Sequence, residues 1–219
     1  MKPILYAHPF SSYSQKVLIA LLENKTPFTY RVLGPDDPAA SAELAAVWPL
    51  QRFPVLVDDG RVILESTVII EYLMLHHPGP VRLIPDDPMA ALEVRMMDRF
   101  FDNYVMTPMQ QVVFDCRRPV GERDPYGVAQ AKATLDAAYR WLDGVMAGRE
   151  WAAAETFSEA DCAAAPALFY ADWVHEIGPQ YPQVRAYRSR LLARPSMARA
   201  VDEGRPYRPL FPPGAPDRD

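Results

Sequence analysis

The stretch Phe53–Ser66 reads FPVLVDDGRVILES, and it decides the fold. Its Asp-Gly pair separates two short runs of aliphatic residues, 55–57 and 62–64. Asp-Gly favours the tight turn of a β-hairpin, because glycine adopts positive φ angles at little cost. Ser66 follows the second run, and serine is a frequent helix N-cap. The stretch therefore predicts an antiparallel hairpin followed directly by a helix over 66–76.

The residues before this hairpin alternate between strand and helix patterns. Residues 4–7 form a short apolar run typical of a buried strand, and 14–23 carry apolar side chains at helical spacing. Residues 28–32 alternate as a strand does, and 41–47 are a weak helix. The order βαβαββα predicts a small α/β domain over residues 1–78, with parallel pairing first and the hairpin last.

A proline-rich segment comes next. Pro78, Pro80, Pro85 and Pro88 lie between two helical patterns, where such a segment neither continues a helix nor makes a good strand. We therefore predict a linker over 79–88 and a second, all-helical domain over 89–219. Its helical patterns cover 89–113, 126–146, 158–174, 183–192 and 196–203. Prolines between 206 and 216 predict an irregular tail lying over the surface.

The composition excludes several classes of protein. The net charge of −5 gives no support for a nucleic-acid partner. No apolar run approaches the roughly 20 residues that span a bilayer. The two cysteines, Cys116 and Cys162, are too few for a disulfide framework or a metal site. We therefore expect a cytoplasmic protein that uses no metal and binds neither nucleic acid nor membrane.

Two junctions between a strand and a helix carry candidate chemistry. Residues 11–14, SSYS, precede the first helix, whose N-terminus favours an anion. A hydroxyl there can hold a thiolate by donating a hydrogen bond; alternatively, these serines only cap the helix, with Ser14 as the plain cap. At Glu65–Ser66, the first helical N–H groups can bind a carboxylate and Glu65 an ammonium, or the pair is a cap beside a solvated glutamate.

These junctions occur in the order and spacing of one family, the cytosolic glutathione transferases. SSYSQKV at 11–17 resembles the serine motif of the serine-type classes, which include zeta-, tau- and theta-like members. WPLQRFPVL at 48–56 is similar to their segment with a cis proline, and Glu65–Ser66 to their Glu-Ser pair. FSEADC at 157–162 resembles the capping box of their second domain. The resemblance implies a thioredoxin-like N-terminal domain, an all-α C-terminal domain and a homodimer.

The resemblance also assigns roles to single residues. It implies that Ser11 hydrogen-bonds the sulfur of glutathione and that Arg52 meets the glycyl carboxylate. The Phe53 backbone, with cis Pro54, faces the cysteinyl unit. The γ-glutamyl end is held by a set of three residues: Glu65, Ser66 and, from a partner subunit, Asp98.

Some positions depart from the family's patterns or stay open. Tyr13 stands where zeta-like members have cysteine, which argues against maleylacetoacetate isomerase activity. Ser11 is not cysteine, so thiol–disulfide exchange through a mixed disulfide is not expected. His8 lies near the site and is a candidate base, with a structural role as the alternative. Five side chains are candidates for an apolar electrophile pocket, of which we expect two or three to line it: Phe10, Met97, Phe101, Tyr104 and Met106.

The resemblance implies conjugation of the glutathione thiolate to a hydrophobic electrophile, a reaction of detoxification. Two alternatives stay open from the sequence. One is a glutathione-dependent lyase, dehalogenase or peroxidase that uses the same thiolate. The other is a glutathione-binding interaction protein with little turnover.

Overall fold

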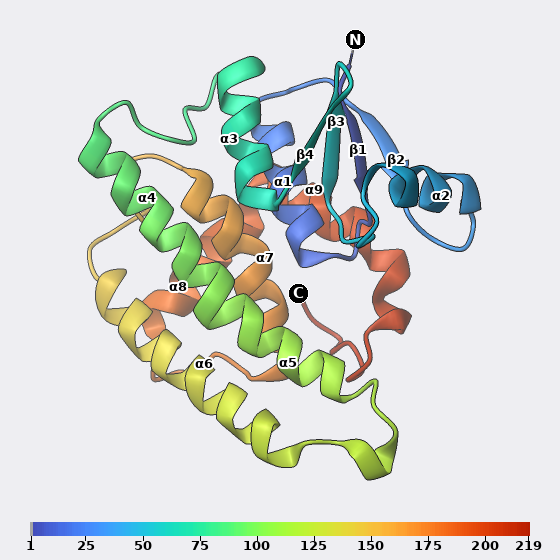
Figure 1. The fold of residues 1–219 in the computed structure, drawn as a ribbon. Coiled ribbons are helices and arrows are strands. Elements are labelled where there is room, and N and C mark those ends of the chain that lie inside the picture. The colour runs from blue at the N-terminus through green and yellow to red at the C-terminus, as the bar shows by residue number, and fades with distance from the viewer. Residues whose placement is uncertain (1) are drawn as a thin grey trace.

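The N-terminal half is built on a four-stranded sheet with the order β2-β1-β3-β4 (Figure 1). A computed structural model describes residues 2–219. The central strand β1 (Ile4–Ala7) pairs in parallel with β2 (Thr29–Val32). On its other side it pairs antiparallel with β3 (Val55–Asp58), which pairs antiparallel with β4 (Arg61–Leu64). The hairpin and the early parallel pair are therefore confirmed.

Helices cover both faces of this sheet because β1 alternates between two cores. Leu5 packs with α1 (Ser12–Glu23) and α3 (Ser66–His76) in the main core. Tyr6 packs on the opposite face with α2 (Pro38–Val47), in a smaller core. The strands β1 and β4 run in the same direction, so α1 and α3, which follow them in the chain, begin at the same end of the sheet.

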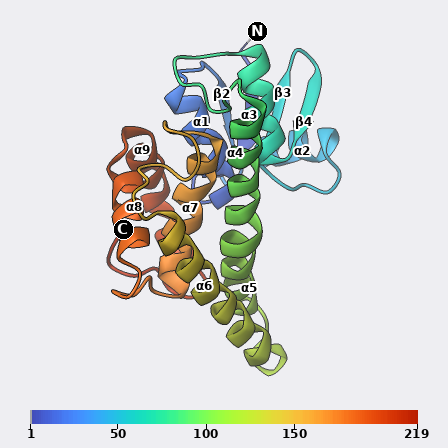
Figure 2. The same cartoon turned by 90° about the vertical axis from the view of Figure 1, so that its left-hand side faces the viewer.

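The second half is helical from Pro88 onward. α4 (Pro88–Phe100) continues through a π-helical segment (Phe101–Met106) into α5 (Thr107–Asp115), and Figure 2 shows this column running from beside α3 to the turn before α6. The helix α6 (Pro125–Val145) packs on α5 and on α8 (Pro182–Ala193), and α8 in turn contacts α9 (Pro195–Gly204). Short 3-10 turns lie at Val120–Glu122 and Arg205–Leu210. None of the helices within residues 2–219 is both long and apolar enough to cross a membrane.

The helix α7 (Glu159–Val174) is the centre of the helical half and contacts α1, α4 and α8. A capping box joins Ser158 and Asp161, as the sequence predicts, with the Ser158 N–H donating to the Asp161 carboxylate at 2.8 Å. The same carboxylate accepts from the Ala152 N–H at 3.0 Å and from the Tyr187 hydroxyl at 2.5 Å. Pro166 lies inside the helix without ending it.

Two sequence predictions need correction. The first helix begins at Ser12 and is capped by Ser11, whereas the Ser14 hydroxyl accepts from the His8 N–H at 3.3 Å. The tail is only partly irregular, since it opens with a 3-10 helix and buries Phe211 in the main core. The Asp219 carboxylate holds the tail back against this 3-10 helix by ion pairs to Arg205 and Arg208.

Candidate active site

A cleft of about 990 Å³ lies where the two halves meet. One end is formed by the β1–α1 turn, the segment before β3 and the start of α3. The other end is formed by α5, by Tyr170 of α7 and by the tail around Phe211. The cleft thus places polar groups at two helix N-termini opposite an aromatic wall.

The β1–α1 turn brings Ser11 to the cleft. Ser11 Oγ accepts from the Ser14 N–H at 3.3 Å and so caps α1. A hydroxyl has two acceptor lone pairs and one donor, so capping leaves the Ser11 hydrogen free to donate to a ligand. Ser12, the first helical residue, also lines the cleft and is 7% exposed. The N-terminus of α1, with its partial positive charge, lies beside both hydroxyls.

His8 lines the cleft, and its ring contacts the β1–α1 turn and the C-terminal 3-10 helix. Its Nδ1 accepts from the Phe10 N–H at 3.1 Å, and its ring packs against Tyr207 with centroids 4.5 Å apart. Burial lowers the pKa of His8 below its usual value, so the ring is neutral at neutral pH. With Nδ1 accepting, the remaining proton of the neutral ring is on Nε2.

A second side of the polar end comes from the segment before β3. The Phe53–Pro54 peptide bond is cis, and Phe53 is 39% exposed at the cleft. Within residues 2–219, the N–H and C=O of Phe53 make no backbone hydrogen bond. Arg52 beside it lines the cleft and has no ion pair among the described residues. The segment therefore offers a free backbone edge and a free cation.

The third side is the junction of β4 and α3. Glu65 has a φ of 67°, uncommon for a residue with a side chain, and such backbone strain concentrates at functional sites. Its carboxylate has no hydrogen bond or ion pair within residues 2–219. Ser66, the first residue of α3, is buried at the same wall. This corner combines an unpaired carboxylate with the free N–H groups of a helix N-terminus.

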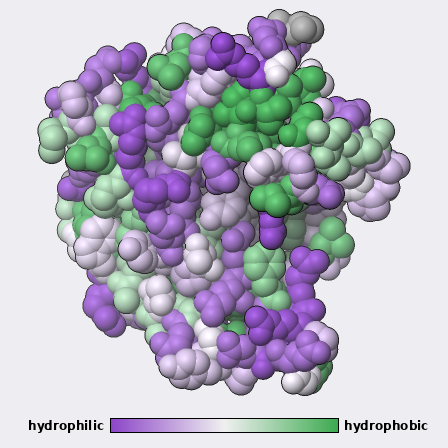
Figure 3. Space-filling view, in the orientation of Figure 1, coloured by the Kyte–Doolittle hydropathy of each residue, from purple (hydrophilic) through white to green (hydrophobic). Residues whose placement is uncertain are grey.

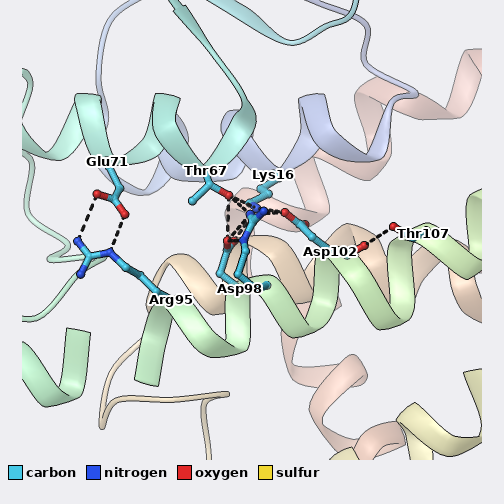
Figure 4. A network of polar contacts seen from close by, with 8 residues as sticks. Lys16, Thr67, Glu71, Arg95, Asp98, Asp102 and Thr107 are labelled. Atoms are coloured by element: carbon cyan, nitrogen blue, oxygen red, sulfur yellow. Dashed lines mark hydrogen bonds and ion pairs between the residues drawn. The ribbon is translucent and has the colours of Figure 1, made fainter. Parts of the chain in front are cut away.

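A buried ion cluster lies beneath this polar end and connects its two helices (Figure 4). Lys16 of α1 is fully buried and contacts Asp98 at 2.5 Å, Asp102 at 2.8 Å and the Thr67 hydroxyl at 2.9 Å. Arg99 pairs with the same two carboxylates. Burial raises the pKa of Asp102, while Lys16 opposes that shift. The cluster joins α1 and α3 to the α4 column.

This cluster corrects the role expected for Asp98. The side chain is fully buried, and Lys16, Thr67 and Arg99 of its own chain occupy its carboxylate. It therefore does not extend from the surface toward the site of a second subunit.

The apolar end differs from the sequence prediction. Of the five candidates only Phe10 lines the cleft, whereas Met97, Phe101 and Met106 are fully buried in the main core. Tyr104 faces a separate hollow beside Trp141. The reason is that α4 packs its inner face on α7, so the column reaches the cleft mainly through α5.

Sequence reasoning included Phe10 but missed the side chains that complete this wall. Phe10, Tyr170 and Phe211 pack together with ring centroids 5.5–6.2 Å apart. Met109 and Val113 of α5 continue the wall, and their four-residue spacing was a detectable signal. Tyr170 and Phe211 carried no such signal, because they reach the cleft only through the packing of α7 and the tail. No group of His, Cys, Asp and Glu able to hold a metal ion occurs within residues 2–219.

Comparisons with known proteins agree with this geometry. The family described as glutathione S-transferase, N-terminal domain, matches residues 5–81, and the corresponding C-terminal domain matches residues 125–190. A probable maleylacetoacetate isomerase of Caenorhabditis elegans is 38% identical over 94 residues, 43% of this chain and 44% of that protein. Glutathione S-transferase U10 of Arabidopsis thaliana is 32% identical over 141 residues, 64% of this chain and 56% of that protein.

The matched regions thus span about half the length of these two relatives. A solved glutathione S-transferase from Methylobacillus flagellatus, with glutathione bound, superposes with a TM-score of 0.81 at 27% identity. That superposition covers 91% of this chain and 98% of the other. Both family domains, in the expected order and with the expected fold, show that this chain belongs to the glutathione S-transferase family.

Proposed function

We propose that this protein binds glutathione at the polar end of the cleft and conjugates its thiolate to a hydrophobic electrophile at the aromatic end. The observation that carries the proposal is the convergence of two helix N-termini, with an unpaired Glu65 and an unpaired Arg52, on one cleft with an aromatic wall. A zwitterionic peptide with a carboxylate at each end complements such charges. An aromatic wall suits an apolar second substrate.

The tripeptide would lie along the polar end of the cleft, with its γ-glutamyl end at α3 and its glycyl end at Arg52. Ser66 and the α3 N-terminus would hold the γ-glutamyl carboxylate, and Glu65 the ammonium. The free backbone edge of Phe53 would pair with the cysteinyl unit, and Arg52 would meet the glycyl carboxylate. The Ser11 hydroxyl would then donate to the sulfur.

Ser11 would promote the reaction by favouring the charged form of the thiol. A free thiol has a pKa of about 8.5, and a hydroxyl donor beside a helix N-terminus lowers it. The thiolate attacks the electrophilic carbon and forms a carbon–sulfur bond. In a substitution the leaving group departs with the electron pair of its bond, and in an addition the new carbanion takes a proton from solvent.

We also propose a cytoplasmic homodimer. Figure 3 shows a hydrophobic area over the β3–β4 hairpin and α3. Val62 of β4 is 41% exposed, and Val68 and Leu75 of α3 are 52% and 78% exposed. Exposed apolar side chains gathered on adjoining elements mark an interaction surface, and twofold dimers are the commonest oligomers.

Binding to immobilised glutathione tests the site. The wild-type protein should be retained and eluted by free glutathione. Glu65→Ala and Ser66→Ala should each raise the dissociation constant about tenfold or more, because each removes a charge-assisted contact. Glu71→Ala is the matched control, since Glu71 lies on α3 in an exposed pair with Arg95.

The activity of the wild-type protein is then measured with glutathione and a panel of aryl halides, enones and hydroperoxides. Conjugation without peroxide reduction supports the proposal. Unchanged dissociation constants in both site variants would remove the placement of glutathione.

A further inference from the structure

The peptide bond directly before Ser11 is held at both of its polar groups. Its carbonyl, on Phe10, accepts from the Tyr170 hydroxyl at 3.2 Å. Its N–H, on Ser11, donates to the His8 carbonyl at 3.0 Å. A peptide unit is planar, so two hydrogen bonds on opposite sides fix its rotation and hence the direction in which the Ser11 side chain leaves the backbone.

The remaining bonds of this turn come from the N-terminal half itself. Gln15 donates from Nε2 to the Pro9 carbonyl at 2.9 Å, and the Phe10 N–H donates to His8. Within residues 2–219, Tyr170 is the one residue of the helical half that donates a hydrogen bond to residues 8–11. Tyr170 therefore fixes the turn relative to the other half of the molecule.

Tyr170 is itself rigidly placed. It is 3% exposed and lies in α7, the helix with the buried capping box. Its ring packs against Phe10 at 5.5 Å, Trp173 at 5.4 Å and Phe211 at 6.1 Å between centroids. A ring enclosed in this way cannot turn without displacing its neighbours, so the hydroxyl holds the Phe10 carbonyl at a fixed point.

We propose that Tyr170 is a positioning residue for the thiolate chemistry: it aims the Ser11 hydroxyl at the sulfur by holding the Phe10–Ser11 peptide. This inference rests on the proposed function. A hydrogen bond weakens steeply once its angle falls, so a rotated peptide loses thiolate stabilisation while the glutathione contacts at Arg52 and Glu65 persist. The helical half would then set the ionisation of a ligand bound mainly by the other half.

Tyr170→Phe tests this role because it keeps the ring in the cleft wall and removes only the hydroxyl. The apparent pKa of the bound thiol should rise by about one unit, so that at a pH well below this pKa the kcat/KM for the electrophile at saturating glutathione falls about tenfold, and it recovers at higher pH. At that pH, where bound glutathione is mostly protonated in both proteins, its dissociation constant should change less than about twofold. The thiol pKa is read from the ultraviolet absorbance of the thiolate in the complex, after subtraction of the spectra of free glutathione and of the protein alone at each pH.

Tyr139→Phe is the matched control. The Tyr139 hydroxyl is also buried and donates to a backbone carbonyl, that of His175, at 3.1 Å, but neither residue lines the cleft. This variant should leave the thiol pKa unchanged. Equal shifts in the two variants would mean general loosening of the helical half and would overturn the inference.

A double-mutant cycle separates action through Ser11 from any other route. In a Ser11→Ala background, Tyr170→Phe should shift the thiol pKa no further, because the hydroxyl that it aims is gone. Additive shifts, or a Tyr170→Phe single variant that titrates as the wild type, would overturn the inference and leave the proposed function standing. A wild-type protein that neither binds nor ionises glutathione would overturn both.

Discussion

The Ser11 hydroxyl accepts a hydrogen bond from the Ser14 backbone N–H at 3.3 Å, so the residue expected to face the sulfur also caps α1. The two tasks use different parts of one group, because the cap uses an oxygen lone pair and the thiolate would use the hydrogen. They therefore do not compete. A substitution at this position should therefore affect stability as well as the proposed thiolate chemistry.

We expect Ser11→Ala to lower turnover at pH 7 by about tenfold to a hundredfold and to move the pH–rate profile to higher pH. Glutathione affinity should change little. Loss of the cap should also cost about 1 kcal/mol of unfolding free energy, seen in urea titration. Ser12→Ala is measured in the same assay and should do much less. If Ser12→Ala is the damaging variant, Ser12 rather than Ser11 faces the sulfur.

Substitutions in the capping box should harm folding more than binding. Ser158→Ala should cost about 0.5–2 kcal/mol, the usual range for a lost N-cap. Asp161→Ala should cost more, since it leaves the Ala152 N–H and the Tyr187 hydroxyl buried without their acceptor. The melting temperature and the glutathione affinity of each variant are measured. We expect a lowered melting temperature and near-normal affinity in the native fraction. Weakened affinity at an unchanged melting temperature would contradict this assignment.

The buried Glu159 should make stability depend on pH. It is fully buried, and no hydrogen-bond partner within residues 2–219 reaches its carboxylate. Burial, then the charges of Asp98 and Glu71, raise its pKa to about 8, against the opposing effect of Lys16 and Arg95. The native state therefore holds a proton that the unfolded chain releases near pH 4.5, the usual value for glutamate.

Because the native pKa is the higher one, this stabilisation is complete below about pH 4.5 and is lost as the pH rises through about 8. Glu159→Gln keeps a neutral side chain at every pH, so its unfolding free energy should decline less than that of the wild type between pH 5 and 8.5. Urea titrations across this range measure the difference. Glu155→Gln, at an exposed position, is the control and should follow the wild type. Parallel curves for all three proteins would show that Glu159 is ionised in the native state.

The proposed dimer face gives a separate prediction. Light scattering should report about twice the 24.7 kDa of one chain at micromolar concentration. Leu75→Glu should shift the protein to monomer, because it places a charge on the exposed apolar face of α3. Tyr126→Glu changes an equally exposed residue on α6 and should not. A wild-type mass near 25 kDa would count against the dimer.

The sequence predicted best those features that depend on neighbouring residues. Asp59 and Gly60 have φ angles of 46° and 79°, as the tight turn between β3 and β4 requires. Local signals also mark the N-termini of two helices, near Ser66 and Pro88, and the capping box at Ser158. The two-part fold followed from these signals.

Features set by packing between distant segments could not be predicted. Asp98 follows a helical pattern whether it faces solvent or Lys16, which is 82 residues earlier in the chain. Phe211 lies in a proline-rich tail whose composition gives no indication that it reaches Phe10 and Tyr170. The apolar pocket was therefore placed one helix segment too early, at Met97 and Met106 instead of Met109 and Val113.

The π-helical segment at Phe101–Met106 sets the face that α5 turns toward the cleft. A π-helix holds one residue more than an α-helix over the same stretch, and each α-helical residue turns the chain by about 100°. If all six residues of this segment were α-helical, α5 would be rotated against the cleft by about that angle. Met109 and Val113 would then leave the wall, whereas Ser11, Arg52 and Glu65 would keep their places. Deleting one residue of the segment would instead restore an α-helical column with the same face of α5 toward the cleft, so the wide turn lets the chain carry an extra residue without disturbing the wall.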